Sequence, residues 1–262
     1  MKMYHIDSFA EAVFEGNPAA VCILGDEWLC EDLMQKIAME NNLSETAFVI
    51  HKDSIRHIRW FTPKCEVNLC GHATLAAAHV LFNHENVQDE EIVFHSRKGL
   101  LSVKKLGDYI MMDFPVDKIE KVEFRDEFDC FDVKPVEFYA GADDYMLVFE
   151  SEEQITGLMC DFMKAAKLSD REGFICTAKG KDVDFVSRYF APKIGIFEDP
   201  VTGSAHTTMA PYWAEVLGKD KLEARQLSER QGRLICEVKG DRVIIGGKAV
   251  TYLIGEMVVD HY

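Results

Sequence analysis

The segment Arg-Trp-Phe-Thr-Pro-Lys at residues 59–64 recurs as Arg-Tyr-Phe-Ala-Pro-Lys at residues 188–193. The two copies lie 129 residues apart in a chain of 262 residues, so their separation is close to half of the chain. Self-similarity at a long, nearly fixed separation indicates repeated structural units. We therefore predict that the chain is an internal duplication.

Further matches support this prediction. Three more pairs of segments occur in the same order, at offsets of 125, 125 and 133 residues: 16–24 with 141–149, 43–45 with 168–170, and 107–110 with 240–243. Small insertions in one half explain why the offset drifts. We expect an N-terminal lobe at residues 1–118 and a C-terminal lobe at residues 119–262, joined through the acidic stretch at residues 116–135.

Hydrophobic patterning gives each lobe both strands and helices. Alternating or apolar runs predict strands in the first half at residues 4–9, 19–24, 47–50, 58–61, 92–94, 100–103 and 109–114. Residues 27–40 have one apolar stripe at helical spacing, whereas residues 71–82 are apolar nearly all round, which is typical of a helix enclosed on every side. The sequence predicts an α+β fold of two pseudo-symmetric lobes, each a β-barrel-like sheet wrapped around a central helix.

The second half repeats this plan. A helix follows Ser151, whose Ser-Glu-Glu-Gln sequence is a capping box. A second helix is expected from near Ser204 to Leu217, ended by Gly218. Pro211 conflicts with this helix, because proline removes a hydrogen bond from a helix interior. It predicts either a kink or a later start.

Composition excludes several classes of partner. The chain carries 45 acidic and 29 basic residues, a formal net charge of −16, which repels nucleic acid and anionic membrane surfaces. The N-terminal stretch is interrupted by His5, Asp7 and Glu11, so it has no apolar signal core. We expect a cytoplasmic protein with eight reduced cysteines.

The two enclosed helices begin at corresponding places, each with a glycine: Gly71 after Cys70, and Gly203 before Ser204. The free amides and dipole of a helix N-terminus bind anions, so these two starts could hold a carboxylate. The alternative is that each glycine only tightens a turn.

Three titratable residues are candidates for catalysis, each with an ordinary alternative. Glu45 stands between a predicted helix and a strand; it is either a solvated surface residue or a desolvated acid with a raised pKa. Asp199 precedes Pro200 and the second glycine-led helix, as a turn aspartate also would. His72 follows Gly71 and could equally be a satisfied core histidine.

Metal and nucleotide sites are disfavoured. Cys65, Cys70 and His72 could recruit zinc together with His206, but no second matching pair of ligands exists. The sequence contains no phosphate loop and no dinucleotide fingerprint, and no nucleophile elbow surrounds Ser204. We expect neither a metal nor a cofactor.

Five segments together resemble one known family. They are GNPAAV at residues 16–21, NLSETAFV at 42–49, the run at 59–81 containing LCGHATLAAAHVL, the run at 188–206 containing EDPVTGSAH, and LSERQGRL at 227–234. In this order they resemble the PhzF-like proteins of phenazine biosynthesis, within the diaminopimelate-epimerase-like fold.

The resemblance implies a function and its residues. It implies a cofactor-independent isomerase, usually a homodimer, with its site in a cleft between two lobes. The member type isomerises trans-2,3-dihydro-3-hydroxyanthranilate, with a glutamate moving a proton along the substrate. That glutamate matches Glu45, and the family's histidine and aspartate match His72 and Asp199. Its substrate-binding glycine and serine positions match Gly71, Gly203 and Ser204.

Cys70 leaves other functions open. A two-base racemase of this fold needs a thiol at both helix starts, and here the second position is Thr202, so paired-cysteine inversion is disfavoured. Cys70 could be a remnant, a second acid or a small apolar residue, the last being preferred. The rivals to an isomerase are an epimerase that uses Cys70 with Glu45, and a non-catalytic protein that binds small anions.

Overall fold

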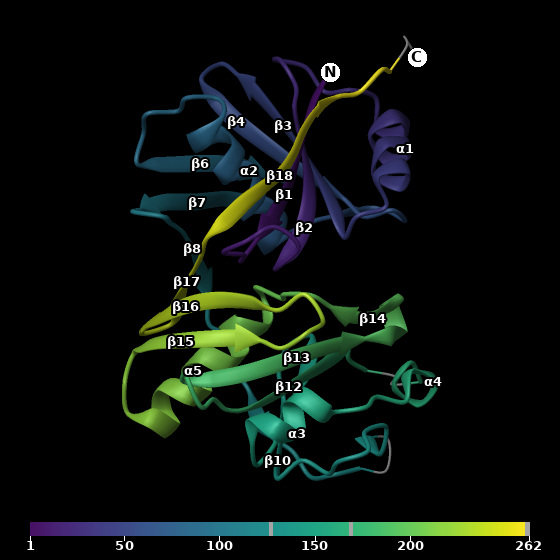
Figure 1. Cartoon of the computed structure of the whole chain (residues 1–262), viewed down its shortest axis with the longest axis vertical. Coiled ribbons are helices and arrows are strands. Elements are labelled where there is room, and N and C mark those ends of the chain that lie inside the picture. The colour runs from purple at the N-terminus through teal and green to yellow at the C-terminus, as the bar shows by residue number, and fades with distance from the viewer. Residues whose placement is uncertain (126–127, 168–169, 260–262) are drawn as a thin grey trace. The chain divides into compact units, whose positions relative to one another are not determined.

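The described residues, 1–125, 128–167 and 170–259, divide into two units in this computed structural model (Figure 1). The first unit contains Met1–Asp113 and the residues from Gly246 onward, and the second contains Phe114–Ile245. The sequence predicts residues 119–262 as one lobe, and the C-terminal segment differs from that expectation. Its strand β18 (Ala249–Glu256) pairs antiparallel with β1 (Lys2–Ser8), so the end of the chain completes the sheet of the first unit.

The first unit is a sheet with two helices. After β1 its elements are β2 (Asn17–Ile23), α1 (Glu31–Asn41), β3 (Glu45–Lys52), β4 (Ile55–Phe61), β5 (Glu66–Val67), α2 (Gly71–Asn83), β6 (Glu91–Ser96), β7 (Gly99–Leu106) and β8 (Tyr109–Pro115). Strand β2 pairs antiparallel with β1 and parallel with β3. Strand β4 pairs antiparallel with β3 and β5 and parallel with β6, and β7 pairs antiparallel with β6 and β8.

Helix α2 is the centre of this unit. Ten of its 13 residues are buried, as the all-round apolar pattern predicts. It packs against β1, β2, β3 and β18, and the run Ala76-Ala77-Ala78 is fully buried, so the sheet can approach the helix backbone closely. Helix α1 instead buries one stripe, formed by Met34, Ile37 and Ala38. It begins at Glu31 rather than at the expected residue 27.

The second unit repeats the strand order of the first. Its elements are β9 (Glu120–Lys121), β10 (Glu137–Ala140), β11 (Asp144–Val148), α3 (Glu152–Gly157), α4 (Phe162–Ala165), β12 (Gly173–Lys179), β13 (Phe185–Ala191), η2 (Pro192–Ile194), β14 (Ile196–Asp199), α5 (Ala205–Leu217), β15 (Lys221–Gln226), β16 (Gly232–Lys239) and β17 (Arg242–Gly247). Strands β10 to β16 pair with one another in the same order and sense as β1 to β7. The duplication is therefore visible in the hydrogen-bond ladders.

The ladders correct one of the four sequence matches. Glu45 pairs with Ala19 in β2, and at the corresponding place in the second unit Gly173 pairs with Asp144. The counterpart of Glu45 is therefore Gly173 and not Asp170; Leu168 and Ser169, which complete that sequence match, lie outside the described residues. A Cβ atom on Gly173 would come within 2.9 Å of the Tyr189 hydroxyl, so this position has no room for a carboxylate.

Helix α5 tolerates its internal proline. Pro211 lies inside α5, which begins at Ala205, so the alternative of a later helix start is wrong. The carbonyl of Thr207, which would normally accept from residue 211, accepts from the backbone N–H of Asp117 at 3.3 Å instead. The helix ends as expected, with Gly218 in the left-handed region and its N–H bonded to the carbonyl of Ala214.

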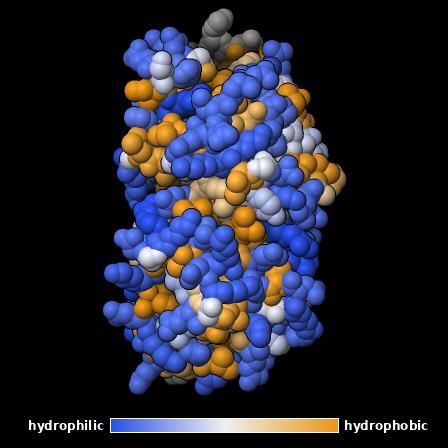
Figure 2. All heavy atoms as spheres, turned by 90° about the vertical axis from the view of Figure 1, so that its left-hand side faces the viewer, coloured by the Kyte–Doolittle hydropathy of each residue, from blue (hydrophilic) through white to orange (hydrophobic). Residues whose placement is uncertain are grey.

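One half of the predicted capping box is present at α3, because the Gln154 side chain accepts from the backbone N–H of Glu150 rather than from that of Ser151. The hydroxyl of Ser151 accepts from the N–H of Gln154, although the helix is only six residues long. In the described part of the chain, no helix is long and apolar enough to span a membrane. Hydrophilic residues cover much of the face drawn in Figure 2, in keeping with the high content of charged side chains.

An arginine–glutamate pair recurs in both units. The Nε atom of Arg59 lies 2.7 Å from Oε1 of Glu66, and that of Arg188 lies 2.7 Å from Oε1 of Glu198. In each case a second guanidinium nitrogen bonds the other carboxylate oxygen, so both pairs are bidentate. Each pair ties β4 to β5, or β13 to β14, just before the enclosed helix begins.

We predict that Glu66→Gln destabilises the protein by roughly 3 kcal/mol, because it leaves a largely buried guanidinium without its main partner. The side chains of Arg59 and Glu66 are 13% and 9% exposed. Urea unfolding measures the change. Glu31→Gln is the control, because Glu31 also contacts Arg59 but its side chain is 66% exposed. Equal effects of the two substitutions would contradict a structural role for the bidentate pair.

Candidate active site

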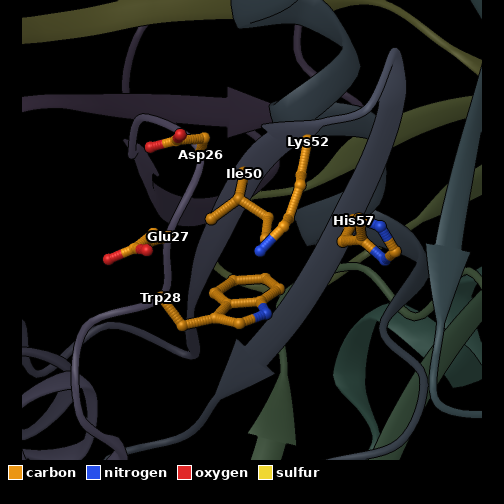
Figure 3. A pocket seen from close by; sticks show the side chains of 6 residues that line it. All are labelled: Asp26, Glu27, Trp28, Ile50, Lys52 and His57. Atoms are coloured by element: carbon orange, nitrogen blue, oxygen red, sulfur yellow. The ribbon is translucent and has the colours of Figure 1, made fainter.

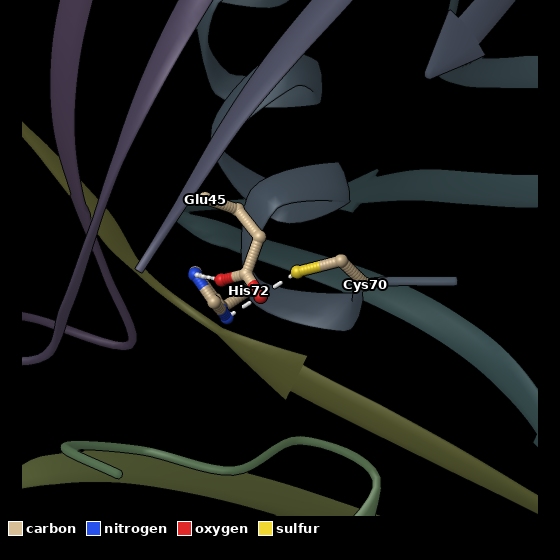
Figure 4. Close-up of side chains that lie close together, drawn as sticks. All are labelled: Glu45, Cys70 and His72. Carbon is tan, nitrogen blue, oxygen red and sulfur yellow. Dashed lines mark hydrogen bonds and ion pairs between the residues drawn. The ribbon is translucent and has the colours of Figure 1, made fainter. Parts of the chain in front are cut away.

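Three predicted site residues lie together in the first unit (Figure 4). Glu45 is the first residue of β3, and His72 is the second residue of α2. Cys70 is the N-cap residue of α2, with extended backbone angles, and its carbonyl accepts from both the N–H and the hydroxyl of Thr74. The start of a strand and the start of the enclosed helix therefore meet at one point.

His72 turns a different ring nitrogen toward each of the other two residues. Its Nε2 atom lies 3.0 Å from Oε2 of Glu45, and its Nδ1 atom lies 3.5 Å from Sγ of Cys70. Both atoms of the histidine–glutamate contact are buried, and neither has a well-aligned hydrogen bond to any described residue. The contact is therefore an ion pair by distance, and both atoms retain hydrogen-bonding capacity.

Burial and charge act in opposite directions on this cluster. Burial alone would lower the pKa of His72, but its interactions with Cys70 and with the Glu45 carboxylate outweigh burial and raise that pKa well above 6.5. Burial raises the pKa of the Cys70 thiol, and the Glu45 carboxylate raises it further. His72 therefore holds its proton more strongly than an ordinary histidine, and Cys70 loses its proton less readily than an ordinary cysteine.

The same three side chains are the one set of potential metal ligands in the described part of the chain, with donor atoms within 4.8 Å of one another. A metal ion binds in line with a single imidazole nitrogen, whereas Cys70 and Glu45 face different nitrogens of His72. The arrangement fits proton transfer better than metal coordination. Cys65, which the sequence grouped with Cys70, is exposed and contacts Thr62.

The other predicted residues lie in the second unit. Asp199 ends β14, and its carboxylate accepts a hydrogen bond from the hydroxyl of Thr202, the counterpart of Cys70. Gln226 holds both, since its side chain accepts from the Thr202 amide and donates to the Asp199 carbonyl, each at 2.8 Å. Gly203 is buried, whereas Ser204 is exposed and makes no capping hydrogen bond.

Sequence reasoning missed a partly buried acid, Asp144, in this unit. Burial raises the pKa of Asp144 to about 7, and the Tyr189 hydroxyl donates to its Oδ1 atom at 2.9 Å. Tyr189 also pairs with Asp199 across β13 and β14. The repeat could have revealed this acid, because Asp144 matches Ala19 in the first half and both lie in apolar strands. A polar residue at such a position needs a hydrogen-bond partner.

A surface hollow lies elsewhere in the first unit (Figure 3). Its volume is about 410 Å³, and it is lined by Asp26, Glu27, Trp28, Ile50, Lys52 and His57. Ile50 and Lys52 belong to the far end of β3 from Glu45. None of the predicted site residues lines it, so the hollow is separate from the histidine-centred cluster.

Comparison with known proteins gives this cluster a context. A sequence profile described as phenazine biosynthesis-like protein matches residues 6–255. The chain belongs to this family. An uncharacterized isomerase of Pseudomonas aeruginosa is 46% identical over 258 residues, which are 98% of each chain. A PhzF-family phenazine biosynthesis protein of Enterococcus faecalis has a solved structure with 47% identity and a TM-score of 0.96, covering 98% of this chain and 99% of that one.

A more distant match defines the fold. A hydroxyproline epimerase of Agrobacterium vitis superposes with a TM-score of 0.61 at 10% identity, over 97% of this chain and 91% of that one. The predicted phenazine biosynthesis-like family and the epimerase-like α+β fold are confirmed. The predicted isomerase class is supported, because several relatives across the whole chain are named isomerases.

We predict a specific pH dependence of stability for His72→Gln. Since the pKa of His72 is higher in the folded protein than in the unfolded chain, its stabilising contribution is complete below about pH 6.5 and is lost as the pH rises through the folded-state value. The wild type should therefore lose stability relative to the variant above pH 6.5, by at most about 1.4 kcal/mol per pH unit. Urea unfolding at several pH values measures this. His51→Gln, at an exposed site on β3, is the control and should follow the wild type; a His72→Gln curve parallel to the wild type would contradict the prediction.

Proposed function

We propose that this protein is a cofactor-independent isomerase that moves a proton within a small carboxylate substrate, with Glu45 as its single acid and base. The observation that carries the proposal is the buried contact between the Glu45 carboxylate and His72 at the start of the enclosed helix. The Glu45 side chain is 14% exposed, so its carboxyl group lies beside His72 and is largely shielded from water.

The proposed reaction begins with Glu45 as a base. Its carboxylate removes a proton from a carbon next to an unsaturated or carbonyl group, so the C–H bond breaks, an O–H bond forms and the electron pair enters the conjugated system. The resulting carboxylic acid then returns the proton to another carbon on the same face. Proton and electrons balance within the substrate and one side chain, so no cofactor is required.

The neighbours of Glu45 have supporting roles in this proposal. The imidazolium of His72 stabilises negative charge as it develops on the substrate. The amides at the start of α2, where Gly71 allows close approach, bind the substrate carboxylate. The family resemblance also assigns Asp199 a catalytic role, in which it orients polar groups of the substrate, and assigns Gly203 and Ser204 to the binding of its carboxylate. It further implies a homodimer. The dihydro-hydroxyanthranilate reaction serves as the chemical precedent.

An epimerase that uses Cys70 and Glu45 as two bases is the second candidate. The contact between Cys70 and His72 favours it, because it places a second side chain that can carry a proton beside Glu45 and His72. Burial opposes it by raising the pKa of that thiol, since a neutral thiol is not a base. Inversion of a stereocentre with solvent deuterium entering at that carbon would identify an epimerase.

We predict that Glu45→Gln lowers turnover by about 10² to 10⁴ and leaves ligand affinity nearly unchanged, because only the proton-transferring group is removed. Small carboxylic acids that raise the melting temperature identify ligands, and ¹H NMR in D₂O follows product formation. Glu40→Gln, at an exposed site on α1, is the control and should retain full turnover. Undiminished turnover in Glu45→Gln would sink the mechanism, and ligands that bind without any proton movement would favour an anion-binding protein.

A further inference from the structure

Cys70 is the member of the cluster to which the proposed isomerase assigns no role. It occupies the N-cap of α2, and its side chain makes no well-aligned capping hydrogen bond, although the backbone N–H of Ala73 is near enough to lower the pKa of the thiol. Its sulfur instead lies 3.5 Å from Nδ1 of His72, on the other side of the ring from Glu45. We propose that Cys70 is a positioning residue, whose thiol holds Nδ1 of His72 so that Nε2 faces the Glu45 carboxylate.

The contact matters because an imidazole ring can be placed in two ways. A rotation of the ring by half a turn exchanges each nitrogen for a carbon, and only a partner at each nitrogen selects one placement. His72 is 6% exposed, so water has little access to an unpaired ring nitrogen. With sulfur at Nδ1 and a carboxylate oxygen at Nε2, one placement of the ring gives each nitrogen a polar neighbour.

Neighbouring groups fix the position of the sulfur. Cys70 is 8% exposed, and its carbonyl is held by two hydrogen bonds from Thr74. The backbone of His72 is fixed as well, since its carbonyl accepts from the hydroxyl of Ser8 on β1 at 2.8 Å. Both ends of the contact between sulfur and nitrogen are therefore anchored by neighbouring elements rather than by the substrate.

The choice of cysteine at this position also favours the proposal. Serine and threonine are preferred N-caps because their hydroxyls bond amides of the first helical turn, and they would draw the side chain away from the histidine. Sulfur is a weaker hydrogen-bond partner and a poor cap, so it can remain beside the ring. In the second unit the N-cap of α5 is Ser204, and the counterpart Thr202 donates its hydroxyl to the Asp199 carboxylate, so the two units use this position differently.

The protonation of His72 should report the contact. Cys70 and Glu45 both raise the pKa of His72, and they are the titratable groups with the largest effects on this ring. Loss of either partner should therefore lower the pH at which His72 titrates. The catalytic consequence of the positioning rests on the proposed function, whereas the contact can be tested without any substrate.

The test is ¹⁵N NMR of the protein labelled at histidine, recorded from pH 5 to pH 9. The His72 signals are assigned by their absence in His72→Gln. We expect Cys70→Ala to lower the titration midpoint of His72 and to change its ring ¹⁵N shifts, and Glu45→Gln to lower the midpoint as well. Cys22→Ala is the matched control, because Cys22 is a fully buried cysteine on β2 whose hydrophobic cluster contains none of the site residues; it should leave His72 unchanged.

Two outcomes decide the proposal. His72 signals in Cys70→Ala that match those in Cys22→Ala would overturn it. If Cys70→Ala fails to fold, Cys70→Ser replaces it, since serine is a good N-cap. In that case, His72 signals in Cys70→Ser that match those of the wild type would overturn the proposal.

A separate readout distinguishes the failure of this inference from that of the proposed function. With a substrate in hand, Cys70→Ala should lower kcat by less than Glu45→Gln does and leave KM nearly unchanged. Full turnover in Glu45→Gln would contradict the proposed function even if the His72 signals change in Cys70→Ala. Unchanged His72 signals in Cys70→Ala would contradict the positioning role even if Glu45 is essential for turnover.

Discussion

The enclosure of α2 constrains the rest of the first unit. A helix that is apolar on every face must be covered on every face, so the sheet has to curve around it. The N-terminal end of such a helix carries first-turn amides that have no partner within the helix, together with the positive end of the dipole. Glu45, at the start of β3, and Cys70 with His72, at the start of α2, meet at that end, where an anion and a charged acid–base group can both be stabilised.

Duplication supplied two such units, and their chemistry has diverged. Both retain the strand ladder and the bidentate arginine–glutamate pair ahead of the helix. At the site positions they differ: Gly173 stands in place of Glu45, and Thr202 in place of Cys70. Asp199 stands where the first unit has Val67, since these residues pair with Tyr189 and Trp60 respectively. One unit thus carries the acid–base cluster, and the other carries an aspartate bonded to a threonine.

The sequence was sufficient for the features that depend on local pattern. The all-round apolar run predicted α2, the repeat predicted two units of one topology, and the motifs predicted the family. The sequence could not show that the counterpart of Glu45 is Gly173 rather than Asp170, three residues earlier. The pairing of a strand is set by its hydrogen-bond ladder and not by local sequence similarity. The sequence grouped Cys70 with His72 only as possible zinc ligands; their direct contact depends on an N-cap side chain that turns toward residue i+2, which the sequence does not specify. The return of β18 to the first unit depends on long-range pairing with β1 and leaves no local signal.

The central claim is that a small carboxylate binds at the start of α2 with its reacting carbon facing Glu45. A crystal structure of the Glu45→Gln variant with a turnover substrate of the wild type tests this most directly. We expect the ligand carboxylate on the first-turn amides of α2, with a carbon within contact distance of the side chain at position 45. A ligand bound instead in the hollow beside Trp28, with no ligand at the start of α2 beside His72, would contradict the claim.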